Sequence, residues 1–264
     1  MAVMQIKFID KIGEGTINKI ESLGRIALFF AVGIIHIFIK PFQGKKILDQ
    51  IVFIGSKSIF VIALTGFFTG MVLGLQGYYS LVRFGSEAAL GSAVALTLIR
   101  ELGPVLTAIM VAARAGSAMA AEIGVMRISE QIDALRTMHI NPVRFLFTPR
   151  IVASIFSFPF LTALFNVVGI FGGYISGSVI LGINQNVYMG TVIESVSIED
   201  ITGGFYKALA FSVVVTTICC YRGFYMHLKG EFGARGVSTA TTNAVVQSCI
   251  FILIVDYAIT FFLV

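Results

Sequence analysis

Residues 125–142, VMRISEQIDALRTMHINP, form a short charged segment between long apolar stretches of the chain. If this segment is helical, Ile128, Ile132 and Leu135 share one face, and the acidic and basic side chains gather on another. It has about three turns, which is too short to cross a bilayer. The pattern predicts an amphipathic helix over residues 125–140 that docks in a groove of a soluble partner. A solvated loop helix is the alternative.

The composition outside this segment is that of a membrane protein. Of the 264 residues, 57% are hydrophobic and only 12% are charged, whereas about a quarter of the residues in soluble domains are charged. The apolar stretches are long and unbroken, unlike the alternating segments of a transmembrane barrel. We therefore predict an all-α integral membrane protein. The net charge of +5 is modest and does not indicate nucleic-acid binding.

Five segments reach the length of about 20 residues that a spanning helix needs. They are residues 51–79, 92–121, 151–181, 203–221 and 243–264. A shorter run at residues 26–39 and an amphipathic pattern at residues 6–23 predict an interfacial region over residues 1–45. An alternative for the amphipathic helix is packing against a partner protein. The whole chain, residues 1–264, is then one domain.

The distribution of basic residues predicts the topology. Most of the 19 basic residues lie before residue 58, between the second and third spans, or between the fourth and fifth spans. The opposite loops hold mainly acidic residues. By the positive-inside rule, the amino terminus and the 125–140 helix are cytoplasmic, and the carboxyl terminus lies on the other side of the membrane.

Small residues recur at every fourth position in three of the spans, which predicts close helix crossings. The three ladders are Gly66, Gly70 and Gly74; Ala108, Ala112, Gly116 and Ala120; and Gly169, Gly173 and Gly177. Pro104 and Pro159 are expected to kink the second and third spans.

Charged residues also occur within the spans, where each costs about 3 kcal/mol or more at a helix centre. They are Arg100, Glu101, Arg114, Lys207 and Asp256. One hypothesis is a set of ion pairs between helices that fixes the bundle. The other is a polar cavity lining that receives a charged headgroup. For Arg114, snorkelling or a packing role is the simpler interpretation.

Several motifs of catalytic and metal-binding proteins are missing from the sequence. It contains no G-x-x-x-x-G-K-[ST] phosphate loop and no H-E-x-x-H, and no G-x-S-x-G nucleophile elbow. The three histidines are scattered, and the three cysteines lie within apolar segments. We therefore expect no metal site, no catalytic residues and no cofactor bound by this chain.

Residues 98–150 carry a series of motifs that resembles the MlaE-type permease family, the membrane subunits of MCE-associated ABC lipid transporters. The motifs are RELGPV (100–105), AARAGSA (112–118), AEIGVMR (121–127), EQI (130–132), Pro142 and PR (149–150). GMVLGLQGY (70–78) is also similar to the family. STATT (238–242) resembles a further family motif but lacks its usual arginine.

This resemblance implies a homodimeric permease in the bacterial inner membrane, with an interfacial amino-terminal helix, five spans and a periplasmic carboxyl terminus. Residues 125–140 match the coupling helix, which sits in a groove of a separate ABC ATPase that binds ATP and Mg. The coupling residues implied are Arg127, Glu130, Asp133, Leu135 and Met138. A small STAS-domain protein bound to the ATPase is a further implied partner.

The resemblance also implies a phospholipid cavity at the dimer interface, open towards a periplasmic MCE-domain protein. Positions matching its wall and its polar groups are Leu73, Ser80, Leu81, Phe84, Arg100, Glu101, Leu102, Lys207 and Asp256. The alternative function is an ion- or proton-coupled secondary transporter that uses Glu101 and Asp256. Such a transporter works without an ATPase, and the chain shows no convincing inverted repeat. A non-transporting scaffold would have no use for the charges in its spans.

Overall fold

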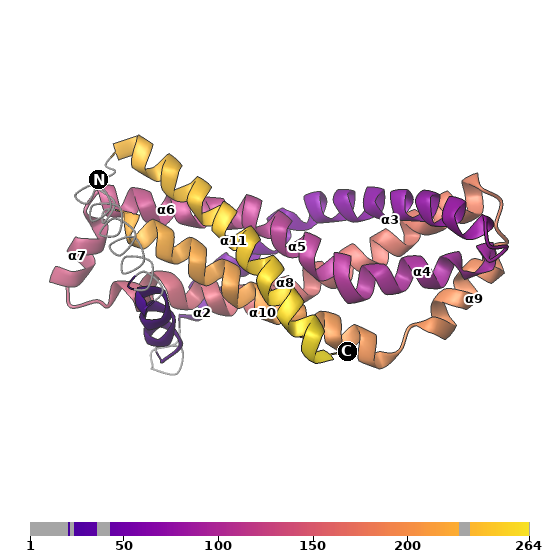
Figure 1. Ribbon diagram of the computed structural model, residues 1–264. Coiled ribbons are helices and arrows are strands. Elements are labelled where there is room, and N and C mark those ends of the chain that lie inside the picture. Colours follow the sequence, from indigo (N-terminus) through magenta and orange to yellow (C-terminus); the bar gives the residue numbers. More distant parts are fainter. Residues whose placement is uncertain (1–20, 22–23, 36–42, 227–232, 264) are drawn as a thin grey trace, which may run out of the picture.

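The computed structural model describes residues 21, 24–35, 43–226 and 233–263, and no strand occurs among them. The described chain is all-α, as predicted. Figure 1 shows an elongated bundle with α7 (Gln131–Thr137) near one end and α9 (Gln185–Ser195) at the other. We refer to these as the α7 end and the α9 end.

The other elements follow one another in long, locally interrupted helices. The α-helices are α2 (Gly44–Ile54), α3 (Ile59–Val82), α4 (Leu90–Thr97), α5 (Gly103–Val111), α6 (Ser117–Ile128), α8 (Pro142–Tyr174), α10 (Ile198–Phe224) and α11 (Gly233–Leu263). The interruptions are 3-10 turns at η1 (Ser56–Ser58) and η2 (Glu87–Ala89), and π-helical turns at η3 (Leu98–Leu102), η4 (Ala112–Gly116) and η5 (Ile175–Ile180).

Five of these helical stretches are long and apolar enough to cross a membrane, which confirms the predicted number. They are Gly44–Val82, Glu87–Ile128, Pro142–Ile180, Ile198–Phe224 and Gly233–Phe262. The first has 39 residues, or roughly 58 Å at 1.5 Å per residue, and the apolar core of a bilayer is about 30 Å thick. The helices therefore extend beyond the apolar runs that the sequence marks.

The first and third glycine ladders face each other where α3 packs against α8. A Cβ atom on Gly70 would lie 1.8 Å from the carbonyl oxygen of Gly169, and one on Gly74 would lie 3.0 Å from that of Gly173. The two backbones are therefore in direct contact, and this confirms the predicted close crossing.

The second ladder packs against α10. A Cβ atom on Gly116 would lie 2.8 Å from the sulfur of Cys219, and one on Gly223 would meet the carbonyl oxygen of Ala120 at 2.6 Å. Cys219 is fully buried and unpaired. Pro104 directly follows the π turn η3 in the second span, whereas α8 continues as one α-helix across Pro159.

A short helix, Gly24–Ile35, lies beside the ends of α8 and α10. Phe29 is buried and its ring packs against those of Phe147, Tyr221 and Phe224. The helix has too few residues to span a bilayer, as predicted for this run. The amphipathic helix predicted at residues 6–23 lies outside the described residues apart from position 21.

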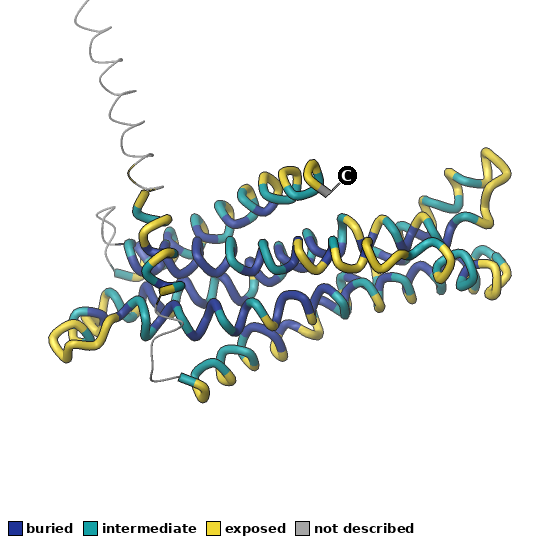
Figure 2. Tube along the Cα trace, turned by 90° about the horizontal axis from the view of Figure 1, so that it is seen from below, coloured by how far each residue is buried: buried dark blue, intermediate teal, exposed yellow. Residues whose placement is uncertain are grey.

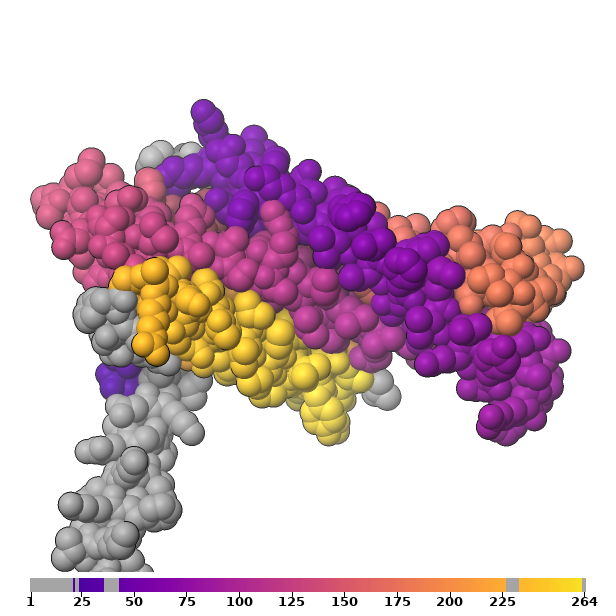
Figure 3. All heavy atoms as spheres, turned by 90° about the horizontal axis from the view of Figure 1, so that it is seen from above, coloured from indigo at the N-terminus to yellow at the C-terminus, as the bar shows by residue number. Residues whose placement is uncertain are grey.

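Two spanning helices keep wide apolar faces exposed. Figure 2 shows the exposed residues along the outside of the bundle, and Figure 3 shows α3 and α11 both at the surface with the second span between them. Phe60 and Phe68 of α3 and Leu253 and Tyr257 of α11 are among the exposed large side chains. These faces are suited to contact with lipid or with another protein chain.

We predict that Gly70→Ala separates α3 from α8 and lowers stability by about 2–3 kcal/mol, the usual cost of overpacking. Gly190→Ala in α9 is the matched control, because no atom lies within 4 Å of its added Cβ. Thermal unfolding of the purified protein in detergent measures both variants. Equal midpoints for the two would contradict the backbone contact.

Candidate functional site

The π turn η3 places Arg100 and Glu101 inside the second span. Pro104 follows this turn and has no N–H, so it gives no helical hydrogen bond to the carbonyl of Arg100 four residues earlier. That carbonyl instead accepts a hydrogen bond from Nζ of Lys207 at 3.0 Å. Single π turns are frequent at functional sites. Here the Arg100 carbonyl, which Pro104 cannot bond, accepts from Lys207 instead.

Lys207 in α10 is the centre of a buried ionic cluster. Its side chain is only 3% exposed, and Nζ lies 2.5 Å from Oε2 of Glu101 and 3.2 Å from Oδ1 of Asp256. Together with the carbonyl of Arg100, these oxygens surround the ammonium group. Lys207 therefore carries its charge within an apolar bundle because two carboxylates and one carbonyl compensate it.

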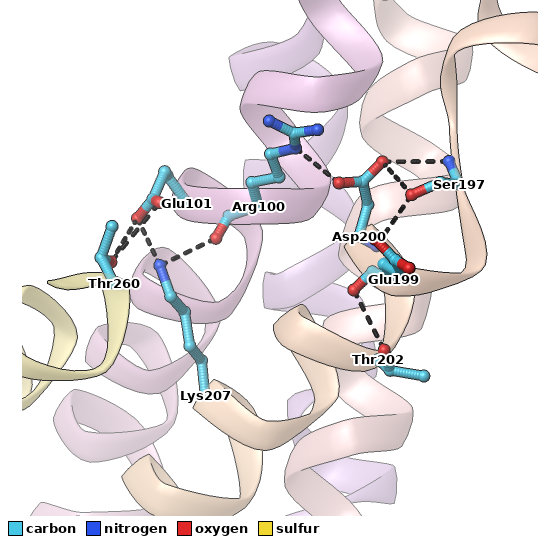
Figure 4. Close-up of polar contacts among 8 residues, drawn as sticks. All are labelled: Arg100, Glu101, Ser197, Glu199, Asp200, Thr202, Lys207 and Thr260. Carbon is cyan, nitrogen blue, oxygen red and sulfur yellow. Dashed lines mark hydrogen bonds and ion pairs between the residues drawn. The ribbon is translucent and has the colours of Figure 1, made fainter. Parts of the chain in front are cut away.

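The same cluster joins α11 to the second span (Figure 4). The hydroxyl of Thr260 lies 3.5 Å from both carboxylate oxygens of Glu101. It also donates to the carbonyl of Asp256 at 2.9 Å. Glu101, Lys207 and Asp256 thus come from three different helical elements. One hypothesis from the sequence was a set of ion pairs between helices, and the structure brings Glu101, Lys207 and Asp256 together in this way.

Arg100 points away from Glu101 and towards the start of α10 (Figure 4). Its Nε donates to Oδ1 of Asp200 at 2.6 Å. The other oxygen of Asp200 accepts from the backbone N–H and the hydroxyl of Ser197. The backbone N–H of Asp200 donates to the Ser197 hydroxyl at 3.3 Å, which completes a capping box. The sequence analysis missed Asp200, although a serine three residues before an acidic residue at a helix start is a recognisable capping signal.

A pocket of about 460 Å³ opens beside these residues at the start of α10. It is lined by Arg100, Glu101, Glu199, Asp200, Thr202, Gly203, Gly204, Tyr206, Lys207 and Thr260. The lining combines two cations, three carboxylates, hydroxyl groups and close backbone. Such a surface can bind a charged or zwitterionic headgroup, while the apolar faces nearby remain available to hydrocarbon.

The remaining predicted cavity residues lie elsewhere in this chain. Leu73, Leu81 and Leu102 are partly buried against the main core. Ser80 is exposed and its hydroxyl donates to the carbonyl of Gln76. Phe84 is 81% exposed. None of the four residues in or just after α3 lines the pocket. A lipid cavity with α3 as one wall would therefore need a further surface opposite α3.

The segment predicted as one helix over residues 125–140 is divided in the structure. Its first turn is the end of α6, Glu130 adopts a left-handed conformation with φ of 57°, and α7 begins at Gln131. The hydroxyl of Ser129 bonds back to the carbonyl of Val125, which favours the break. A helix–turn–helix hairpin therefore replaces a continuous amphipathic helix.

Ion pairs and one buried side chain fix α7. Asp133 lies 3.0 Å from Arg127 at the end of α6 and 3.4 Å from Arg136. Ile132 is fully buried in a cluster with Phe147. Of the other predicted coupling residues, Glu130 and Met138 are exposed and Leu135 is partly buried. Glu130 and Met138 are accessible on the surface of the hairpin, whereas Asp133 and Arg127 hold it together.

A second ion pair closes the base of this hairpin and was not singled out from the sequence. Arg150 in α8 is 3% exposed; its Nη2 lies 2.8 Å from Oε2 of Glu122 in α6, and its Nη1 donates to the carbonyl of Leu146 at 2.6 Å. Ser154 continues the network by donating to the carbonyl of Arg150 and accepting from Thr216. α6, α8 and α10 are thereby tied together near the α7 end.

Arg114, the remaining charge within a span, lies in the π turn η4. Its guanidinium donates to the carbonyl of Phe53 at the end of α2 and, at 3.2 Å, to the hydroxyl of Ser58. The last carbonyls of a helix lack helical partners and attract cations. The packing role considered for Arg114 is therefore the one that its contacts support.

Outside the spans, Tyr188 anchors α9. The side chain is fully buried and its hydroxyl donates to the carbonyl of Ile170 at 3.2 Å. Burial raises the pKa of this phenol well above its usual range, so the tyrosine stays neutral and acts as a packing residue. Among the residues that the structure describes, no group of three His, Cys, Asp or Glu side chains is arranged to hold a metal ion.

Comparison with known proteins extends over nearly the whole chain. The family model described as Permease MlaE matches residues 47–262. The Intermembrane phospholipid transport system permease protein MlaE of Haemophilus influenzae is 39% identical over 261 residues, which is 97% of each chain.

Two further relatives widen the range of organisms. A Probable ABC transporter permease protein of Rickettsia bellii is 40% identical over 257 residues, or 97% of this chain and 98% of the relative. The chloroplastic protein TRIGALACTOSYLDIACYLGLYCEROL 1 of Arabidopsis thaliana is 35% identical over 239 residues, or 90% of this chain and 65% of the relative. The similarity thus includes both ends of the bundle, the pocket and the α7 hairpin.

We predict that Lys207→Met destabilises the protein by about 3 kcal/mol, because it leaves buried or half-buried carboxylates without their cation. The double variant Lys207→Met/Asp256→Asn removes one of those carboxylates and should recover part of the loss. Thermal unfolding in detergent gives the comparison, with Lys57→Met at an exposed site as the control. A double variant no more stable than the single one would contradict the pairing.

Proposed function

The chain belongs to the MlaE permease family, and from this premise we propose that it is the membrane subunit of an ABC transporter that moves phospholipids between the bacterial inner membrane and a periplasmic MCE-domain protein. The observation that carries the proposal is the ionic pocket beside Arg100, Glu101 and Lys207 within an otherwise apolar bundle. A lipid is amphipathic, and this site offers polar groups next to exposed apolar helix faces.

The proposed topology places the α7 end in the cytoplasm and the α9 end in the periplasm. Loop charges support this orientation, because Arg127, Arg136 and Arg144 lie at the α7 end, whereas Glu194 and Glu199 lie towards the other. The pocket then opens on the periplasmic half of the membrane, where an MCE-domain protein can receive or deliver lipid.

The α7 hairpin is the proposed docking element for a separate ATPase. Glu130, Leu135 and Met138 present a mixed surface of one charge and two apolar groups, which suits a groove on a soluble subunit. ATP and Mg are bound by that subunit, on which a small STAS-domain protein also sits. This chain supplies no catalytic group for hydrolysis.

We further propose that two copies of the chain form the functional unit. The exposed faces of α3 and α11 support this, since each is wide and apolar. Leu73, Leu81 and Leu102 with Ser80 and Phe84 would then complete a lipid cavity whose polar part is the pocket at the start of α10. ATP-driven movement does work on the lipid only if one state of the cavity binds it more tightly than another.

The deciding experiment is gentle affinity purification of the tagged chain from membranes, with mass spectrometry of the proteins and lipids that co-purify. Recovery of an ATPase, an MCE-domain protein and phospholipid supports the proposal. A preparation that lacks an ATPase in mild detergent, yet still moves lipid or an ion in vesicles, would overturn it in favour of ion-coupled transport.

We predict that Glu130→Lys lowers recovery of the ATPase at least tenfold without loss of the permease from the membrane. The Glu130 side chain is exposed and the residue is in the left-handed conformation. Reversing its charge therefore changes the proposed docking surface and leaves the contacts of Asp133 and Ile132 in place. Glu87→Lys, an exposed acidic residue at the start of the same span, is the matched control. Unchanged ATPase recovery for Glu130→Lys would argue against docking at α7.

A further inference from the structure

We infer that the pocket at the start of α10 selects phospholipids whose headgroup carries an ammonium group, with Arg100 binding the phosphate and Glu199 the ammonium. This inference rests on the proposed function and adds the headgroup class to it. Some charged side chains of the pocket already have partners within the protein, and others do not.

Two of the five charged groups, Lys207 and Asp200, are fully occupied by the protein, and Glu101 is paired although 43% of its side chain stays exposed. Lys207 is surrounded by the Arg100 carbonyl and two carboxylates, and Glu101 is held by Lys207 and Thr260. Asp200 uses one oxygen for Arg100 and the other for the capping box with Ser197. Lys207 and Asp200 fix the shape of the pocket, and a ligand could engage them only by displacing an existing contact. Glu101 adds a partly exposed carboxylate, and so further negative charge, to the lining.

Arg100 and Glu199 are the two charged groups most open to a ligand. The Arg100 side chain is 56% exposed and hydrogen-bonds through Nε, and its two terminal nitrogens make no hydrogen bond to any residue that the structure describes (Figure 4). Glu199 lines the same pocket, is exposed, and its carboxylate has no ion pair within the described part of the chain. The Asp200 contact through Nε also orients the outer edge of the guanidinium, which is the edge that binds phosphate oxygens.

The charge balance of the pocket then decides between headgroups. An anionic headgroup satisfies Arg100 but leaves Glu199 as an unpaired carboxylate close to added negative charge. A zwitterionic headgroup with a terminal ammonium satisfies both groups at once. Exposed ion pairs are weak, so the expected preference is modest, about threefold.

Glu199 could also have a purely structural role, and the experiment must distinguish that role from binding of the headgroup. It lies in the first turn of α10, where an acidic residue stabilises the helix dipole. That role affects the melting temperature and is indifferent to the lipid headgroup. Glu194 in α9 is an exposed acidic residue outside the pocket, and Glu194→Gln provides a matched loss of one charge.

The experiment places the full-length protein, with the subunits that co-purify, in nanodiscs of equimolar phosphatidylethanolamine and phosphatidylglycerol. After extraction into mild detergent, mass spectrometry gives the ratio of the two lipids retained. We expect about threefold enrichment of phosphatidylethanolamine for the wild type and for Glu194→Gln. Glu199→Gln should reduce the ratio to about one, and Glu199→Lys should reverse it.

Retained lipid with no preference in the wild type, or an unchanged preference in both Glu199 variants, would overturn the inference and leave the proposed lipid transport standing. Retention of neither lipid by any variant would overturn the proposed function as well. Melting temperatures of the same samples show whether Glu199 variants lose helix stability; a reversed ratio in Glu199→Lys cannot arise from that loss alone.

Discussion

In the hydrocarbon core of a membrane no water is available to solvate a charged group, so its partners must come from the protein itself. Lys207 is where this constraint is strongest. Its ammonium binds Glu101 of the second span, Asp256 of α11 and the backbone carbonyl of Arg100, to which Pro104 cannot donate. The relative placement of three helices, and therefore the floor of the pocket, follows from neutralising one side chain.

The carboxylates can reach Lys207 only because the helices that carry them approach closely, and small residues permit that approach. Gly70 and Gly169 bring α3 and α8 into backbone contact. Gly223 does the same for α10 and the second span, where Gly116 leaves room for the sulfur of Cys219. Dispersion contacts and polar pairs rather than hydrophobic burial hold helices together in a membrane. The glycine ladders and the ionic cluster are accordingly two parts of one packing solution.

Periodicity and composition were sufficient for the helical class, the number of spans and the glycine crossings, because those depend on local pattern. The partners of Arg100 and Arg150 were not predictable in this way. Asp200 is a hundred residues from Arg100, and Glu122 reaches Arg150 across the hairpin, so both pairings depend on tertiary placement. The division of the 125–140 segment was missed because its apolar spacing fits one helix, whereas Glu130 takes a left-handed conformation that spacing does not encode.

The second span connects the two regions of interest in one element. It carries Arg100 and Glu101 at the pocket and Arg127 at the α7 hairpin, where Asp133 pairs with it and the Glu122–Arg150 pair closes the base. The α7 hairpin is thereby held to both α6 and α8. The span contains one π turn, η4, between hairpin and pocket and another, η3, at the pocket itself, and π turns are frequent at functional sites. The cluster around Lys207 lies at one of them, so a change of register there would alter the contacts of Arg100 and Glu101 directly.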